Sequence, residues 1–159
     1  MVCGSSSSLA NFHHHSEDLS CFQDSTIHNT GNKGKISLTM TVSSGRHPPL
    51  AVLFQDSIFY IRVSRIKARS VWVASVAGQM VKEDCSRFLV FLDLRCPDDS
   101  SAPSFSFSGP PCSLTSSVEG VLKDGNCLVL TDPAVYNITS GRVKERKLIV
   151  TLRIENVKS

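Results

Sequence analysis

The chain lacks the closely spaced cysteines on which RING domains and zinc ribbons depend. Such sites need cysteine pairs about two residues apart, because one tight turn must present two ligands to the same metal. The six cysteines are widely spread, and even the nearest two, Cys85 and Cys96, are far beyond that spacing. A RING is therefore excluded from this sequence.

Long apolar runs are also absent. The longest, such as residues 88–92, fall far short of the roughly 20 residues that a membrane-spanning helix requires. Residues 1–10 have neither the basic start nor the apolar stretch of a signal peptide. We therefore expect no membrane contact and a reducing compartment, the cytoplasm or alternatively the nucleus, in which the cysteines stay free.

Histidine is scarce outside one triplet, which argues against nucleophilic catalysis. A Ser or Cys nucleophile needs a His base and an orienting carboxylate, but His28 and His47 both lie in turn-like sequence. We predict no catalytic residue and interpret Cys85 and Cys127 as small buried side chains. An enzyme with a Ser or Cys nucleophile is the alternative.

The only cluster of metal-ligand residue types lies near the start of the chain and includes His13, His15 and Cys21. Consecutive histidines on an extended chain point in alternating directions, and no cysteine pair accompanies them. We therefore expect no cofactor, with zinc at these three residues as the alternative.

Charge and hydrophobicity are typical of a folded domain. Hydrophobic residues make up 41% and charged residues 19% of the 159 residues, which is enough to build a core. The net charge of +3 comes from basic residues scattered among acidic ones. Because nucleic-acid-binding proteins gather such charge into a patch or stripe, we expect no nucleic acid partner.

Residues 1–35 are polar and predict a tail, whereas residues 36–157 predict one β-rich domain. Ranges 50–54 and 58–63 are two strands or one strand with a bulge, and 71–76 and 88–94 are expected to pair. We expect 88–94 to lie centrally, covered on both faces. Asp132 is expected to cap a helical turn through Tyr136. The ranges predicted as strands are 36–42, 50–54, 58–63, 71–76, 88–94, 105–107, 127–130 and 148–154.

Short strands separated by Pro, Gly and Ser turns, with no helical period of any length, indicate the fold class. We predict an all-β chain folded as an antiparallel β-sandwich with one or two short helical turns.

Several segments together resemble a known family. Residues 51–63, 71–78 and 88–94, followed by 117–121 and 127–130, occur in the order found in the C-terminal domain of the seven in absentia ubiquitin ligases. The helix after Asp132 and residues 148–154 complete the match, which covers residues 36–154. The resemblance implies a TRAF-like β-sandwich that dimerises and recruits proteins for ubiquitination. In that family a RING and two zinc fingers precede this domain, and residues 1–35 resemble at most a degraded zinc-finger remnant.

Family members bind a Val-x-Pro type peptide by adding it as a strand to a sheet edge. The resemblance implies that the corresponding edge here comprises residues 36–42 and 50–54. Ala51 stands where the family has a tryptophan that packs on the peptide, which leaves the peptide preference open. The side chains implied for this edge are Leu38, Met40, Val42, Val52, Leu53 and Phe54.

The predicted function is therefore a substrate-recognition and dimerisation module of the seven in absentia type. Its expected partners are protein substrates or adaptor peptides, and a second copy or a RING-containing relative. The chain is either a RING-less paralogue or a fragment of a longer ligase, and it would not transfer ubiquitin alone. The alternative is an unrelated β-sandwich scaffold or regulatory interaction domain.

Overall fold

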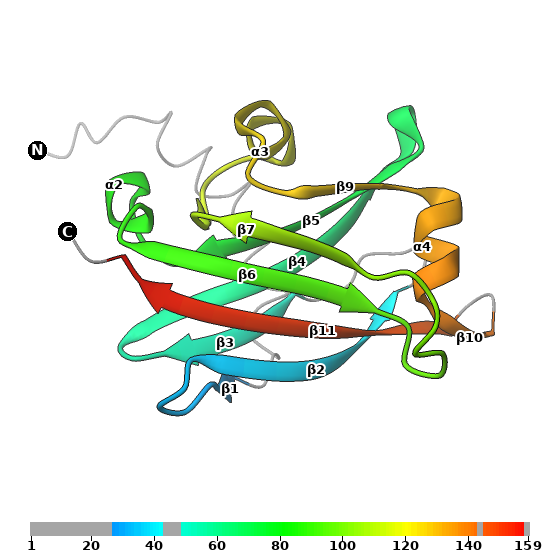
Figure 1. Ribbon diagram of the computed structural model, residues 1–159. Coiled ribbons are helices and arrows are strands. Elements are labelled where there is room, and N and C mark those ends of the chain that lie inside the picture. Colours follow the sequence, from blue (N-terminus) through cyan, green and yellow to red (C-terminus); the bar gives the residue numbers. More distant parts are fainter. Residues whose placement is uncertain (1–26, 43–48, 143–144, 158–159) are drawn as a thin grey trace, which may run out of the picture.

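The computed structural model describes residues 27–42, 49–142 and 145–157, and this part of the chain is all-β with few helices (Figure 1). Within it, no helix is long and apolar enough to cross a membrane. The strands are β1 (Ile27–Asn29), β2 (Lys35–Val42), β3 (Leu50–Phe54), β4 (Ser57–Ile66), β5 (Val71–Gly78), β6 (Phe88–Arg95), β7 (Phe105–Gly109), β8 (Cys112–Ser113), β9 (Leu128–Thr131), β10 (Ser140–Arg142) and β11 (Glu145–Asn156). The helices are the 3-10 turn η1 (Lys67–Arg69) and α2 (Lys82–Cys85), α3 (Val118–Asp124) and α4 (Asp132–Ile138).

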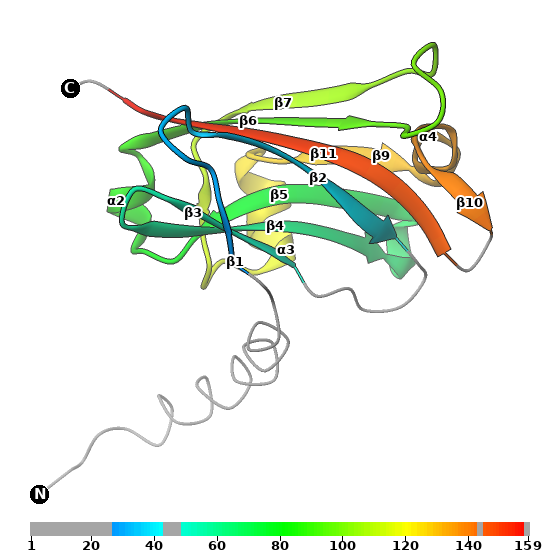
Figure 2. The same cartoon turned by 90° about the horizontal axis from the view of Figure 1, so that it is seen from below.

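The strands form two sheets that face each other as layers (Figure 2). The first, called the β4 sheet, has the order β1-β3-β4-β5, with β8 and β9 pairing different parts of β5. The second, called the β11 sheet, has β2 on one side of β11 and β6 on the other, followed by β7. The short β10 pairs with the start of β11.

One apolar core lies between the two sheets. The β4 sheet contributes side chains such as Val52, Phe59 and Ile61, and the β11 sheet contributes Leu92 and Leu152. All five are almost fully buried. The alternation of apolar residues along each strand places them on one face, because successive side chains of a strand point to opposite sides. This burial supplies the main force that holds the sheets together.

Most strand predictions are confirmed. Residues 36–42 form β2, 105–107 lie in β7, 127–130 largely coincide with β9, and 148–154 lie in β11. Residues 50–54 and 58–63 are two strands, β3 and β4, and not one strand with a bulge, since Phe54 pairs with Ser57 across a two-residue turn.

The predicted pairing of residues 71–76 with 88–94 is wrong. These residues lie in β5 and β6, which belong to different sheets. β5 pairs with β4, β8 and β9, whereas β6 pairs with β11 and β7. The chain crosses from one layer to the other between them, through α2.

The prediction for residues 88–94 is only partly right. β6 does lie between two strands of its sheet, but among the described residues only one of its faces is covered by another layer. On the outer face, Phe91 is half-buried beneath the guanidinium of Arg153, which lies 3.9 Å from the ring centroid. The Arg153 side chain therefore partly covers the outer face of β6, which was expected to be covered by another layer of the protein.

Several boundaries and details also differ from expectation. The folded part begins before residue 36, because β1 pairs with β3 at residues 27–29. This β1–β3 pairing and the β5–β8 pairing are parallel, so the chain is not wholly antiparallel. Three α-helices occur where one or two helical turns were expected, and Thr131, not Asp132, caps α4 by accepting a hydrogen bond from the N–H of Ala134.

Candidate functional site

The six side chains expected at the peptide-binding edge do not lie on one edge. Residues 38, 40 and 42 belong to β2 in the β11 sheet, whereas residues 52–54 belong to β3 in the β4 sheet. The two strands are consecutive in sequence but lie in opposite layers. The expected single edge is therefore corrected to two strands in different sheets, of which β3 lies between β1 and β4.

Four of these six side chains are part of the core. Met40, Val42, Val52 and Phe54 are all at most 7% exposed. Alternation directs every second side chain of each strand inward, and these four residues take the inward positions. Their side chains are thus not available to a ligand in the described conformation.

The remaining two, Leu38 and Leu53, are half-buried. Leu38 packs against the core from β2, while Leu53 pairs with Ile58 and Asn29 in the other sheet. Ala51, at the family's tryptophan position, is only 3% exposed. A side chain that is so deeply buried cannot serve as a peptide platform.

The backbone of β2, unlike these side chains, has hydrogen-bonding groups that are available to a ligand. β2 pairs with β11 on one side, and among the described residues no strand pairs with its other side. Its register with β11 runs without interruption from Lys35, opposite Arg153, to Val42, opposite Arg146. An unpaired edge of this kind carries a row of free N–H and C=O groups.

The hydrogen bonds next to β2 identify which residues carry the free groups. Ile154 N–H donates to Gly34 C=O at 2.8 Å, so these opposed residues are a hydrogen-bonded pair. Hydrogen-bonded and non-hydrogen-bonded pairs alternate along an antiparallel ladder. Leu38 therefore directs its backbone groups toward β11, as do the other even-numbered residues of β2. The residues that direct them away from β11 are Lys35, Ser37, Thr39 and Thr41.

Two further contacts support this assignment. Val157 N–H donates to Arg87 C=O at 2.8 Å, so the odd-numbered residues of β11 bond toward β6 and leave the even-numbered ones for β2. The hydroxyls of Ser37 and Thr151 lie 2.9 Å apart, as expected of a non-hydrogen-bonded pair, in which the side chains approach more closely.

The other sheet edges are short or flanked by proline. β1, β8, β9 and β10 have at most four residues each, and β7 has five. Pro103 precedes β7 and Pro110 follows it. β2 has eight residues, no proline and no bulge. Since proteins protect exposed edges by shortness, proline, charge or bulges, β2 is the edge least protected against pairing with another strand.

Apolar side chains border the free edge of β2. Ile36 and Leu38 on β2 and Leu50 on β3 are half-buried and pack against the core. Because each retains some exposed surface, an additional strand beside β2 would cover apolar area there.

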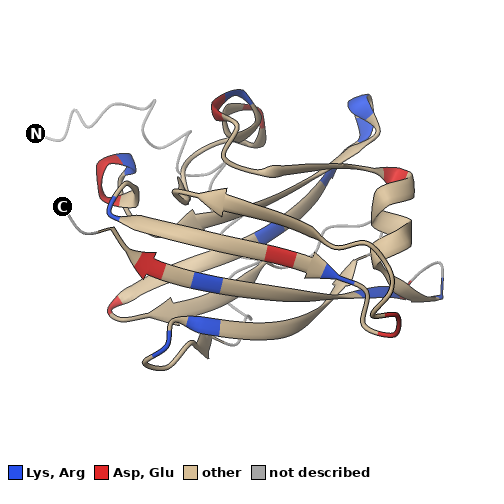
Figure 3. Ribbon diagram, in the orientation of Figure 1, with Lys and Arg blue, Asp and Glu red and all other residues tan. Residues whose placement is uncertain are grey.

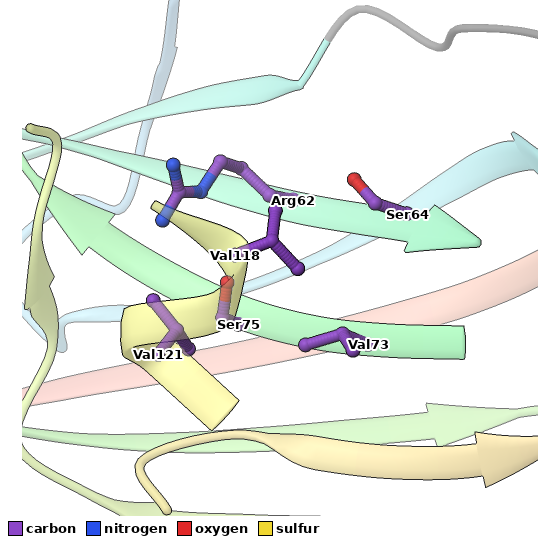
Figure 4. A pocket seen from close by; sticks show the side chains of 6 residues that line it. All are labelled: Arg62, Ser64, Val73, Ser75, Val118 and Val121. Atoms are coloured by element: carbon purple, nitrogen blue, oxygen red, sulfur yellow. The ribbon is translucent and has the colours of Figure 1, made fainter. Parts of the chain in front are cut away.

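The described surface has two hollows of very different size. One lies between α3 and the outer face of the β4 sheet, where Arg62, Ser75 and Val121 are among its lining residues (Figure 4). Its interior volume of about 10 Å³ is just enough for one water molecule. The other, about 660 Å³, is an open polar depression near the turn between β1 and β2, bordered by Lys33 and Glu155.

Two cysteine thiols in the described part of the chain, those of Cys85 and Cys127, have raised pKa values. Cys85 is 2% exposed, and burial raises its pKa to about 11. Burial also raises the pKa of Cys127. Because the thiolate is the nucleophile, a raised pKa lowers the reactivity of buried Cys85 and of half-buried Cys127 at neutral pH. Cys112 accepts a hydrogen bond from the Nη2 of Arg62 at 3.2 Å.

Charged residues of both signs are spread among the strands, helices and loops of the described residues (Figure 3). No group of three or more His, Cys, Asp or Glu residues within the described ranges is arranged to hold a metal ion. The weak zinc candidates His13, His15 and Cys21 lie outside the described residues.

Sequence reasoning missed the residues with free backbone groups, Ser37, Thr39 and Thr41, because it considered apolar side chains alone. The alternation of residues 36–42 and their lack of proline were visible in the sequence. That β2 lies at an edge depends on its pairing with β11, more than 100 residues away along the chain, as the Ser37–Thr151 contact shows.

No family model matches the chain, and no curated protein matches it.

Proposed function

We propose that this chain is a binding domain that takes up an extended segment of another protein as an additional strand beside β2. The observation that carries the proposal is the regular edge of β2, with outward backbone groups on Ser37, Thr39 and Thr41, with which no strand of the described residues pairs. In this mode of recognition, main-chain hydrogen bonds give affinity and the side chains beside the edge give specificity.

The biological setting that we propose rests on the resemblance to the seven in absentia ligases. The domain would be a TRAF-like β-sandwich that presents bound proteins for ubiquitination in the cytoplasm or nucleus, as a dimer or with a RING-containing relative. The all-β, two-sheet architecture is compatible with this proposal. The alternative is an unrelated β-sandwich scaffold that uses the same edge for another purpose.

The edge can be tested with a proline substitution that leaves the sheet intact. The N–H of Thr39 points away from β11, so Thr39→Pro removes an outward donor without removing a β2–β11 hydrogen bond. We would select binders from a phage-displayed library of random dodecapeptides and measure their Kd by fluorescence anisotropy. We expect Thr39→Pro to weaken binding at least about tenfold, because one lost hydrogen bond and a steric block act together.

Two control variants make the result specific. Thr39→Ala changes the side chain but keeps the N–H, and we expect it to bind within about threefold of the wild type. Ser108→Pro places proline on β7, the opposite edge of the same sheet, at a residue that also directs its N–H outward. Peptides that bind Thr39→Pro as well as the wild type, or a library that yields no binders, would overturn the proposal.

The ligase setting is tested separately. With a conjugating enzyme and ubiquitin, we expect the isolated chain to transfer no ubiquitin, because ligases of the RING type act by holding the charged conjugating enzyme and this chain has no RING. Robust transfer by the isolated chain would contradict the proposal that it is only the recognition part of a ligase.

A further inference from the structure

Along β2, the residues with outward backbone groups are also the ones whose side chains lie on the outer face of the sheet. Ser37 and Thr39 have free backbone groups, and their exposed side chains lie on the outer face of the β11 sheet. Ile36 and Leu38 direct their backbone groups toward β11, and their side chains pack against the core. A strand added to β2 meets hydroxyls on one face and aliphatic side chains on the other.

The β11 sheet favours an antiparallel addition. Its pairings β2–β11, β11–β6, β6–β7 and β10–β11 are all antiparallel. The two parallel pairings among the described residues belong to the β4 sheet, where β1–β3 joins three residues and β5–β8 joins two. Antiparallel pairs are also slightly more stable per residue than parallel pairs.

We infer that β2 selects an antiparallel segment with aliphatic side chains at every second residue, in which only the intervening residues need a backbone N–H. This inference rests on the proposed function and specifies its ligand. The aliphatic residues lie opposite Ile36 and Leu38, and the intervening residues lie opposite Ser37, Thr39 and Thr41. From Lys35 to Thr41 the paired segment has about seven residues, since opposed strands match residue for residue.

The hydrogen-bond pattern of an antiparallel pair determines which residues of the added strand need a backbone N–H. In an antiparallel pair, a residue opposite Thr39 exchanges two hydrogen bonds with it, so its N–H is required. A residue opposite Leu38 is in a non-hydrogen-bonded pair, so its N–H points away from β2, and its side chain lies close to that of Leu38. Proline or an N-methyl group is thus tolerated at the aliphatic positions and excluded from the intervening ones.

N-methyl scanning of a peptide selected from the dodecapeptide library tests this inference. Each residue is N-methylated in turn, and the Kd for the full chain is measured by anisotropy. We expect N-methylation of an intervening residue to weaken binding at least about tenfold, because it removes an N–H that bonds to β2. N-methylation of an aliphatic residue should change the Kd less than about threefold, because its N–H points away from β2. We also expect Leu38→Ala to weaken binding, whereas Ser108→Ala, at an exposed residue on β7 at the opposite edge of the sheet, should leave binding unchanged.

The possible failures are distinguishable. Loss at the aliphatic positions and tolerance at the intervening ones would indicate parallel addition and overturn this inference, provided that binding remains sensitive to Thr39→Pro. A uniform or patternless scan with the same sensitivity would also overturn it and leave the edge function standing. If no selected peptide is sensitive to Thr39→Pro, both the inference and the proposed function fail.

Discussion

Asp132 anchors the start of α4 to the end of the β4 sheet. Its Oδ1 accepts hydrogen bonds from the Nε of Arg65 at 2.9 Å and the Nε1 of Trp72 at 2.8 Å. Its Oδ2 accepts a third from the Nη2 of Arg65 at 2.9 Å. These bonds, first that of Arg65 and then that of Trp72, lower the pKa of Asp132 to about 2. The indole N–H of the sole tryptophan thus has a charged partner.

This arrangement predicts a dependence of stability on pH. Because the pKa of Asp132 is lower in the folded state than its ordinary value of 3.8, the stabilisation is complete above that value and is lost as the pH falls toward 2. We expect Asp132→Asn to be less stable than the wild type at pH 6 and to lose less stability between pH 4 and pH 2. Thermal unfolding followed by Trp72 fluorescence measures both effects.

A matched variant separates this contact from a general loss of charge. Asp98→Asn removes the same charge from an exposed loop residue, and we expect it to retain the pH dependence of the wild type. If Asp132→Asn and Asp98→Asn gave the same pH profile, the Arg65–Asp132–Trp72 contact would not be the cause.

At the scale of elements, Arg146 on β11 secures the end of α4. Its Nη2 donates to the carbonyls of Tyr136 and Thr139, at 3.0 and 2.6 Å, and its Nη1 donates to Gly141 C=O at 3.0 Å. Its Nε donates to the Oγ1 of Thr139 at 2.7 Å, and the guanidinium lies 4.1 Å from the centroid of the Tyr136 ring. The last carbonyls of a helix lack partners within the helix, and this side chain supplies them.

We therefore expect Arg146→Lys to destabilise the domain nearly as much as Arg146→Ala, by about 2 kcal/mol, because an ammonium cannot reproduce the planar set of donors. Urea unfolding measures the change. Arg142→Lys, at an exposed position on β10, is the control and should stay within about 0.5 kcal/mol of the wild type. Full retention of stability in Arg146→Lys would show that charge alone suffices.

The assignment of even-numbered β2 residues to hydrogen bonds with β11 also predicts how proline substitutions change the stability of the domain. Leu38 N–H bonds to β11, so Leu38→Pro breaks the ladder and should cost about 3 kcal/mol or more, whereas Thr39→Pro should cost clearly less. Urea unfolding of the two variants compares neighbouring residues of one strand. If the two variants lost equal stability, or if Thr39→Pro lost more, the assignment of the Leu38 N–H to the hydrogen bonds with β11 would be wrong.

Strand positions were predictable from the sequence because period-two alternation marks them, as in β2 and β11. Pairing was not predictable, because β5 and β6 are neighbours in sequence but belong to different sheets. β1 was missed because its three residues, Ile27–Asn29, are too few for a pattern. α3 was missed because its seven residues, Val118–Asp124, are too few to show a helical period, although the Ser117 cap and the left-handed Gly125 mark its two ends. Of the two ranges predicted to form the peptide-binding edge, residues 36–42 lie in an edge strand, β2, whereas residues 50–54 lie in β3, between β1 and β4.

At the scale of the whole molecule, the two sides of the paired sheets differ. On one side β7 and β9 are in contact across the layers. On the other side, no strand of the described residues pairs with the outer edge of β2, which lies beside half-buried Ile36 and Leu38. The described part of the molecule is thus asymmetric, and the long strand β2 lies on the side to which we propose that a partner strand is added.

The proposed relation to the seven in absentia ligases also predicts an oligomeric state. We expect size-exclusion chromatography with light scattering to give about twice the 17.3 kDa mass of one chain. A monomer at concentrations of tens of micromolar would favour the alternative, an unrelated β-sandwich scaffold.

Amide hydrogen exchange, resolved by residue with NMR, tests the central claim about β2 most directly. In the free protein, we expect the N–H groups of Ser37, Thr39 and Thr41 to exchange rapidly and those of Leu38 and Met40 slowly, because only the latter bond to β11. A saturating selected peptide should slow the exchange of Ser37, Thr39 and Thr41. If these three amides were already protected in the free protein, or still exchanged rapidly with the peptide bound, strand addition at β2 would be contradicted.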